Sequence, residues 1–364
     1  MGDMLEYIKW RGDLPFSLVP PNEVDSLIFS TFVYMDLTGL VDEEMEHPVP
    51  LNVVAEAFFA LPDHESRVRA KADLALLKSM AQSERFKKTQ LTFFRSIFIP
   101  EEETQFAAMT FLLDDGSAVL SFRGTDSSLV GWKEDFNLSF QDFVPAQLEA
   151  QKYTQEFAAA YSLPMHLCGH SKGGNLAVFA AAASNPEVQK RIVSVYNNDG
   201  PGVTEYMLQN PGYHAIVPRI RTYIPESSMI GVLLDREESY TVIKSRQVSL
   251  LQHEPYSWEI LGGSFVRLQE MSDNIVFMDK TIKKWIASMN REDREKFVDA
   301  VFSLLAAGGA DQTADLIQPK NILAFFKALN ADDAVKKQLY DGFLHLFRAA
   351  MDIRSQQELV KTEE

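Results

Sequence analysis

Hydrophobic and polar residues alternate at helical spacing through the first ninety residues. The pattern is clearest over residues 25–34 and 70–87. Two prolines, Pro48 and Pro50, interrupt it between these segments. We therefore expect a mainly helical N-terminal portion over residues 1–90.

Strand-forming residues dominate from Leu91 onward. Two apolar runs, 106–113 and 118–122, flank the sequence Asp114-Asp115-Gly116. An Asp-Gly pair between apolar runs is a strong hairpin signal, because both residues accept the backbone conformations of a tight turn. Residues 91–122 are expected to form an antiparallel edge of a sheet.

Short apolar strands then alternate with helices. We expect helices at 147–161 and 176–183, and strands at 165–168, 191–196, 219–224 and 240–248. Strands separated by helices predict a mostly parallel sheet with right-handed crossovers. From residue 266 helical spacing returns, in segments 273–289, 294–307 and 334–351. The chain is predicted to hold an α/β core over 91–265 and a helical C-terminal portion over 266–364.

Charge and cysteine content narrow the classes of partner and cofactor. The 35 Lys and Arg residues stand against 51 Asp and Glu residues, a net charge of −16 that opposes binding to nucleic acid and to anionic lipid. Cys168 is the only cysteine, which excludes an intramolecular disulfide and a cysteine-based zinc site. No phosphate-binding or dinucleotide-binding glycine motif occurs, so we expect no cofactor and no metal. The first residues lack the features of a signal peptide, and we expect a cytoplasmic protein without a stable membrane anchor, whose oligomeric state stays open.

The chemically most informative stretch is Gly169-His170-Ser171-Lys172-Gly173. It is a Gly-x-Ser-x-Gly pentapeptide between an expected strand and an expected helix, which is the context of a nucleophile elbow. The glycines two residues from Ser171 permit a turn tight enough to raise the hydroxyl above the sheet edge. The following helix brings N–H groups and its positive dipole end to the same place. The alternative is a glycine-rich turn without chemistry.

A second stretch, Arg123-Gly124-Thr125, follows an expected strand and precedes Trp132 and Asp135. Together with the elbow it resembles the oxyanion region of the class 3 (fungal-type) lipases, over roughly residues 90–260. That resemblance implies an α/β-hydrolase core. It also implies that the residues holding the oxyanion are Thr125 and Lys172, the latter through its backbone N–H. The alternative is a strand end with a solvated arginine.

The whole chain also resembles the bacterial Mbeg1-like family of lipase-like proteins. Three motifs carry this resemblance: Asn-x-Val-Asp at 22–25, Gly-His-Ser-Lys-Gly-Gly-Asn at 169–175 and Gln-His-x-Pro-x-Ser-Trp at 252–258. The resemblance implies an α/β-hydrolase core and no particular substrate.

A serine nucleophile requires a base, and the chain has seven histidines. In α/β-hydrolases the histidine follows the last strand. His253 fits this place, in a loop that Pro255 keeps out of helical conformation. His214 and His345 are the other candidates that follow the nucleophile and its strand.

Three carboxylates remain open as the residue that orients the base. Asp199 lies at the end of the strand after the nucleophile helix. In the class 3 lipases the aspartate lies one strand later, where this chain has Ser227, so Glu226 or Asp235 could supply the carboxylate from a shifted register. Asp199 is the first choice, although it could also be a turn residue that binds its own backbone.

These residues predict a serine esterase that forms an acyl-enzyme intermediate with a small acyl ester. The absence of the class 3 aspartate leaves a non-catalytic binding scaffold as the rival, and a thioesterase or peptidase would share the same triad. Residues 126–145 carry an apolar side that could act as a lid over an acyl pocket or simply pack on the core. The charge leads us to expect dispersed short- to medium-chain esters as substrates, without interfacial activation.

Overall fold

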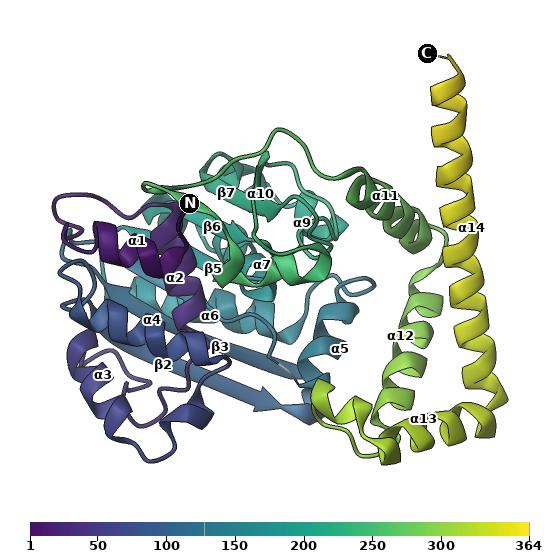
Figure 1. Ribbon diagram of the computed structural model, residues 1–364, viewed down its shortest axis with the longest axis horizontal. Coiled ribbons are helices and arrows are strands. Elements are labelled where there is room, and N and C mark those ends of the chain that lie inside the picture. Colours follow the sequence, from purple (N-terminus) through teal and green to yellow (C-terminus); the bar gives the residue numbers. More distant parts are fainter. Residues whose placement is uncertain (127, 364) are drawn as a thin grey trace.

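The computed structural model describes residues 1–126 and 128–363 and is built around one eight-stranded sheet (Figure 1). The strands lie side by side in the order in which they occur along the chain. The first three pairs are antiparallel and the remaining four are parallel. The strands are β1 (Val49–Pro50), β2 (Gln90–Ile99), β3 (Thr104–Leu112), β4 (Ala118–Phe122), β5 (Met165–His170), β6 (Ile192–Asn198), β7 (Ile220–Pro225) and β8 (Tyr240–Ile243).

The N-terminal helices cover one face of this sheet. Alternate residues of each strand point to opposite faces. Val119 of β4 and Cys168 of β5 therefore pack with Phe29 and Leu76 of these helices in one buried cluster. The helices are α1 (Met4–Arg11), α2 (Glu23–Phe32), α3 (Leu51–Ala60) and α4 (Lys71–Gln82).

The opposite face packs against helices from the middle of the chain. Leu120 and Leu167, one residue removed from Val119 and Cys168, lie in a second buried cluster with Tyr153 and Leu176. The central strands β4 and β5 are buried on both faces along their whole length, which accounts for their largely apolar sequences. The helices of this part are α6 (Pro145–Ala160), α7 (Lys172–Ala183), α8 (Pro186–Arg191), α9 (Glu205–Leu208) and α10 (Pro211–Ile216).

The sheet order and the two helical layers are those of an α/β-hydrolase, which confirms the predicted fold class. The expected strand over 240–248 ends early, at Ile243. Beyond it the backbone of Lys244 bonds to Glu259 and Val266 rather than to β7. A small antiparallel pair follows, β9 (Ile260–Leu261) with β10 (Ser264–Phe265).

The C-terminal helices stand beside the core (Figure 1). They are α11 (Asp273–Ala287), α12 (Arg291–Ala306), α13 (Pro319–Ala331) and α14 (Asp333–Glu363), of which the sequence pattern did not predict α13. Phe302 of α12 packs at 5.5 Å from the Phe136 ring of α5 (Leu129–Asn137), and Arg294 donates to the carbonyl of Ser139. These contacts join the C-terminal portion to the segment after β4.

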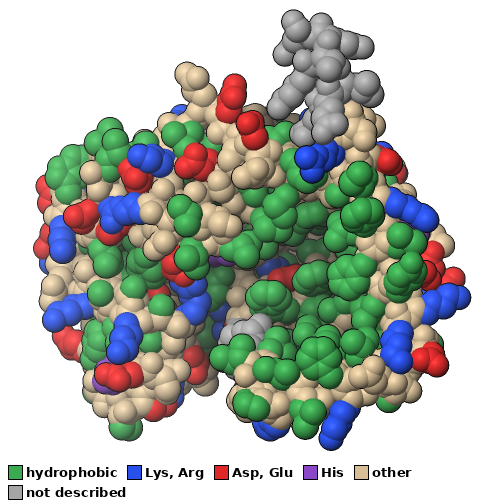
Figure 2. Space-filling model, turned by 45° about the vertical axis from the view of Figure 1, so that its right-hand side comes forward, with side chains coloured by type: hydrophobic (Ala, Val, Ile, Leu, Met, Phe, Trp, Pro, Cys, Tyr) green, Lys and Arg blue, Asp and Glu red, His purple; other side chains and the backbone are tan. Residues whose placement is uncertain are grey.

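Large hydrophobic side chains remain exposed on these helices. Figure 2 shows hydrophobic side chains gathered around a hollow between the C-terminal helices and the core. On α14 they follow one another at helical spacing. The exposed large hydrophobic residues of α13 and of the described part of α14 are Ile322, Leu323, Phe326, Tyr340, Phe343, Phe347 and Met351.

Candidate active site

Ser171 lies in the sharp turn between β5 and α7. Its backbone has φ 59° and ψ −136°, a conformation that costs a non-glycine residue energy and is held only by its surroundings. A Cβ atom on Gly169 would lie 2.1 Å from the carbonyl carbon of Gly173. One on Gly173 would lie 2.1 Å from the carbonyl oxygen of Phe122. Both positions therefore require glycine, and the predicted elbow geometry is present.

The loop after β4 lies directly against Ser171. A Cβ atom built on Gly124 would be 3.0 Å from the Cβ of Ser171. The neighbouring Thr125 donates its hydroxyl to Asp135 Oδ2 of α5 at 2.5 Å. Arg123 is only 13% exposed rather than solvated, and desolvation lowers its pKa. Thr125 is therefore held at the side of the nucleophile, where the resemblance had placed an oxyanion residue.

His253 ends a short 3-10 helix, Ser249–His253, and contacts Asp199. Its Nδ1 lies 2.6 Å from Asp199 Oδ2, while the carboxylate is fully buried and also accepts a hydrogen bond from Ser228 Oγ at 2.7 Å. Burial raises the pKa of Asp199, and the bond to His253 works against that rise. With Nδ1 donating to the carboxylate, Nε2 is the nitrogen available to accept a proton.

The ring of His253 is held beside the elbow by His170, the residue before Ser171. The two imidazole centroids are 4.4 Å apart, and His170 Nε2 donates to the carbonyl oxygen of His253 at 2.8 Å. Burial lowers the pKa of His170 well below its ordinary value, so the ring is neutral at neutral pH. Its Nδ1 faces the hydroxyl of Tyr34 at 3.4 Å. His170 therefore links the strand of the nucleophile to the loop of the base.

Two further contacts, which the sequence did not predict, join the loop of His253 to the N-terminal portion. Arg69 donates two hydrogen bonds to Glu254, at 2.8 and 3.0 Å, and Tyr256 donates to Asp73 at 2.7 Å. Because these residues flank His253 on its C-terminal side, the N-terminal helices help to fix the loop. No local sequence signal identifies Arg69 or Asp73 as residues that hold the loop of His253.

The other two candidate carboxylates lie elsewhere. Among the hydrogen bonds and ion pairs of the described residues, the Glu226 side chain makes none with His253. Asp235 is mostly exposed and pairs with Lys283 of α11 at 3.2 Å. Ser227 occupies the place where the resemblance sets the class 3 aspartate, and its neighbour Ser228 bonds to Asp199. Of the three open choices, the structure brings Asp199 to the histidine.

The other histidines that follow the nucleophile strand face solvent. His214 on α10 lies 3.0 Å from Glu237, and His345 on α14 lies 3.1 Å from Ser288. Over residues 1–126 and 128–363, no group of three or more His, Cys, Asp or Glu side chains is arranged to hold a metal ion. In the same part of the chain, no helix has the length and apolar character needed to cross a membrane.

The segment proposed as a lid forms α5, although residue 127 lies outside the described residues. Its apolar residues divide into two groups. Leu129, Leu138 and Phe140 are buried, whereas Trp132 and Phe136 are 47% and 43% exposed. The helix therefore combines core packing on one side with an exposed apolar side.

Comparison with known proteins identifies a family and several distantly related structures, two of which are lipases. The model of the Mbeg1-like family matches residues 80–303. The native propeptide complex of the Rhizomucor miehei lipase is 16% identical, covers 49% of this chain and 70% of its own, and has a TM-score of 0.34. The crystal structure of M37 lipase is 13% identical, with coverages of 59% and 70% and a TM-score of 0.38. None of the curated proteins matches the chain.

Proposed function

The chain belongs to the Mbeg1-like family, and from the geometry of its site we propose that it is a serine hydrolase that cleaves acyl esters. The nucleophile is Ser171, the base is His253, and Asp199 orients the base. The observation that carries the proposal is the bond of 2.6 Å between His253 and the buried Asp199, next to a strained elbow that presents Ser171.

The reaction follows from the parts of this site. His253 Nε2 takes the hydroxyl proton as Ser171 Oγ attacks the ester carbonyl, and the negative charge that develops on the carbonyl oxygen is held by Thr125 and by the backbone N–H of Lys172. The imidazolium then gives its proton to the departing alkoxide, leaving an acyl-enzyme. Water, deprotonated by the same histidine, attacks the acyl group, and the imidazolium then returns its proton to Ser171 Oγ as the acid is released. Asp199 stabilises the imidazolium in both halves of the reaction.

A fluorophosphonate probe tests this proposal most directly. The folded wild-type chain is expected to label, because a serine activated by a base displaces fluoride from phosphorus. Ser171→Ala is expected not to label. Ser227→Ala is the matched control, since its hydroxyl is close by in the fold but bonds to Ser272. Labelling is measured on a gel and the modified residue by peptide mass spectrometry.

Each outcome of this experiment separates the proposed hydrolase from its rivals. A wild-type chain that labels no better than Ser171→Ala, while both are folded, would leave the binding scaffold as the better account. Against the scaffold stands the backbone of Ser171, which costs about 1–3 kcal/mol and has no use without chemistry. If Ser171 labels, a panel of p-nitrophenyl esters, acyl-thioesters and peptide amides distinguishes an esterase from a thioesterase or peptidase.

The proposed substrates are short- to medium-chain esters with an apolar acyl portion. Trp132 and Phe136 are exposed on α5, the helix that carries the Asp135 carboxylate bonded to Thr125. Leu250 and Leu251, just before His253, are 60% and 62% exposed. Exposed apolar side chains on α5 and on the segment that carries His253 favour contact with an acyl chain.

We expect hydrolysis of p-nitrophenyl acetate through octanoate, with a rate that follows dissolved substrate and does not rise sharply at the solubility limit. The double variant Trp132→Ala/Phe136→Ala is expected to raise KM for the octanoate by about tenfold and to leave the acetate nearly unchanged, since only the longer chain buries apolar area there. Leu18→Ala, 70% exposed on the N-terminal portion, is the control. Equal effects on both esters, or activity confined to emulsified long-chain substrate, would contradict this substrate range.

A further inference from the structure

A buried ion pair joins the residue after the nucleophile to helix α5. Lys172 Nζ lies 2.8 Å from Glu134 Oε2, and their side chains are 1% and 0% exposed. The same ammonium donates to the backbone oxygen of Gln105 at 3.0 Å and to its side-chain Oε1 at 3.1 Å. Each of the three N–H donors of the ammonium therefore has a protein acceptor.

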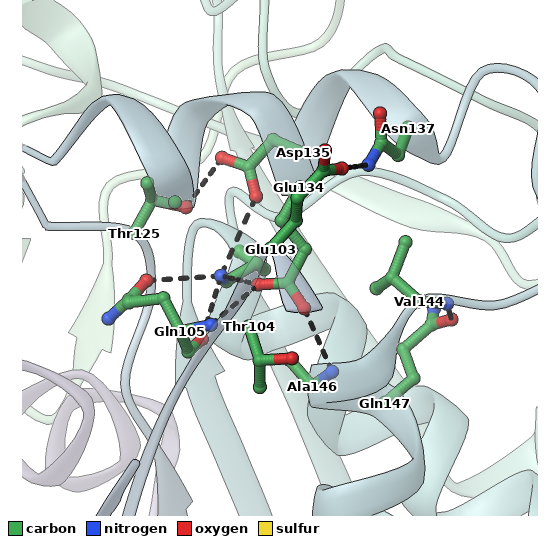
Figure 3. A network of polar contacts seen from close by, with 12 residues as sticks. Glu103, Thr104, Gln105, Thr125, Glu134, Asp135, Asn137, Val144, Ala146 and Gln147 are labelled. Carbon is green, nitrogen blue, oxygen red and sulfur yellow. Dashed lines mark hydrogen bonds and ion pairs between the residues drawn. The ribbon is translucent and has the colours of Figure 1, made fainter. Parts of the chain in front are cut away.

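Glu134 extends the contact to two further elements (Figure 3). Its Oε1 accepts the backbone N–H of Ala146 at 2.9 Å, in the first turn of α6, where the helix dipole favours a negative charge. Its Oε2 also accepts the backbone N–H of Gln105 on β3 at 3.2 Å. One carboxylate thus connects α5, α6, β3 and the first residue of α7.

Asp135, the next residue on α5, contacts the loop after β4 that carries Thr125. Asp135 Oδ2 accepts the Thr125 hydroxyl, and Asp135 Oδ1 lies 3.9 Å from Lys172 Nζ with no hydrogen-bond partner among the described residues. Thr125 and Lys172 are the two residues proposed to hold the oxyanion. Their side chains are therefore coupled through adjacent carboxylates on one helix.

We propose that the Lys172 side chain is a positioning residue for the oxyanion hole. With Glu134 and Asp135 it sets the distance between the elbow and the loop of Thr125. This inference rests on the proposed hydrolase function and assigns to the side chain of Lys172 a part beyond that of its backbone N–H. We call Lys172, Glu134 and Asp135 with their partners Gln105 and Thr125 the array. Stability alone does not account for it, because an apolar pair in place of Lys172 and Glu134 would hold the same elements without removing two charges from water.

The array also has an electrostatic consequence for Asp135. Burial raises the pKa of Asp135 to about 6, and the positive charge of Lys172 limits that rise. His253 and the hydrogen bond from Thr125 act in the same direction as Lys172, whereas Glu134 raises the pKa further. Burial raises the pKa of Tyr34, and the negative charge of Asp135 adds to that rise. The ionised carboxylate, present above this pKa, is the form that accepts the Thr125 hydroxyl. Removing the Lys172 charge raises the pKa of Asp135 further, so the carboxylate then ionises only at higher pH.

The test compares Lys172→Met with Lys133→Met. Methionine keeps most of the apolar stem of lysine and removes the ammonium. Lys133 lies on α5 next to Glu134, but it pairs with Glu103 and Asp299 and not with Glu134 or Asp135. In Lys172→Met we expect kcat for p-nitrophenyl acetate to fall about tenfold to a hundredfold with KM nearly unchanged, because a displaced oxyanion donor weakens the transition state and not substrate binding. The acid limb of the kcat profile is expected to move to higher pH.

The pH profile identifies the part played by Asp135. In an Asp135→Asn background, the added Lys172→Met substitution is expected to leave the acid limb where it is. Lys133→Met is expected to keep both kcat and the wild-type profile. A Lys172→Met protein that is folded and shows unchanged kcat and an unchanged profile would overturn the inference, and so would an equal loss in Lys133→Met.

Two further measurements distinguish a failure of this inference from a folding defect and from a failure of the proposed function. If Lys172→Met leaves Glu134 as an unpaired buried charge and does not fold, Lys172→Met/Glu134→Met removes both charges and is expected to show the same loss of kcat. Full activity in that double variant would contradict the inference. If the wild-type chain fails to label with fluorophosphonate, the proposed function fails first. If it labels, the Lys172 variants alone decide the positioning role.

Discussion

Replacement of His253 by alanine is expected to lower kcat for p-nitrophenyl esters by about 10⁴- to 10⁶-fold, because without a base the Ser171 hydroxyl keeps its proton. The loss should fall on kcat, since the imidazole acts in the transition state and not in binding the ester. The ring is about a quarter exposed and its removal opens no buried cavity, so folding is expected to persist. Rates are measured at pH 8 with circular dichroism as the folding check.

The control for this variant is His214→Ala. His214 also follows the nucleophile in the chain, but it lies on α10 beside Glu237, where it contacts no member of the proposed triad. Its replacement should leave the rate within about twofold of wild type, as expected for a surface change away from the chemistry. A collapsed rate in His214→Ala together with a retained rate in His253→Ala would reassign the base.

The centre of the sheet could be predicted from the sequence because β4 and β5 are buried along their whole length. Residues 118–122 and 165–168 are mostly apolar, interrupted only by Ser121 and His166, and the structure places β4 and β5 there. The end of β8 could not be predicted, since its partners after Ile243 are Glu259 and Val266, which reach it by a loop. The sequence pattern did not predict helix α13, although Pro319 stands in its first turn. Its apolar residues Ile322, Leu323 and Phe326 remain exposed.

The elbow and the carboxylate differ in what fixes them. The turn at Ser171 is local, since glycines two residues away and a strand and helix on either side are enough to specify it. The bond between Asp199 and His253 joins residues 54 positions apart, and it depends on where β6 ends and how the loop after β8 returns. Arg69 is 185 positions from Glu254, so their contact depends on how α4 and the residues just before it pack against the core. Sequence spacing therefore selected the nucleophile and left the acid open.

The buried charges around Lys172 show a second limit. In the sequence, Glu134 and Asp135 are consecutive acids on an amphipathic segment, a pattern typical of a solvated face. The structure turns Glu134 inward to Lys172 and α6, while Asp135 turns to Thr125. Neighbouring helix residues point about 100° apart, so one acid could enter the core and the other border the site. Only the position of α5 against β3 decides which of them does so.

Substitution of Asp199 by asparagine is expected to lower kcat by about 10³- to 10⁴-fold without unfolding the protein. Asparagine has nearly the same shape, and it tolerates the φ of 56° that Asp199 adopts better than most other residues do. Its amide nitrogen would donate to His253 Nδ1, so the proton of the neutral ring moves to Nε2. Nε2, the nitrogen proposed to take the hydroxyl proton, then has no lone pair with which to accept it.

The other two carboxylates supply the controls. Glu226→Gln and Asp235→Asn are expected to keep the wild-type rate, because Asp235 is bound to Lys283 and the Glu226 side chain has no bond to His253 among the described contacts. Thermal unfolding of Asp199→Asn should stay within a few degrees of wild type, since its hydrogen-bond partner Ser228 remains in place. An unaffected rate in Asp199→Asn together with a collapsed rate in Glu226→Gln would assign the orienting carboxylate to Glu226, just after β7. A normal rate in all three variants would show that His253 acts without a carboxylate partner.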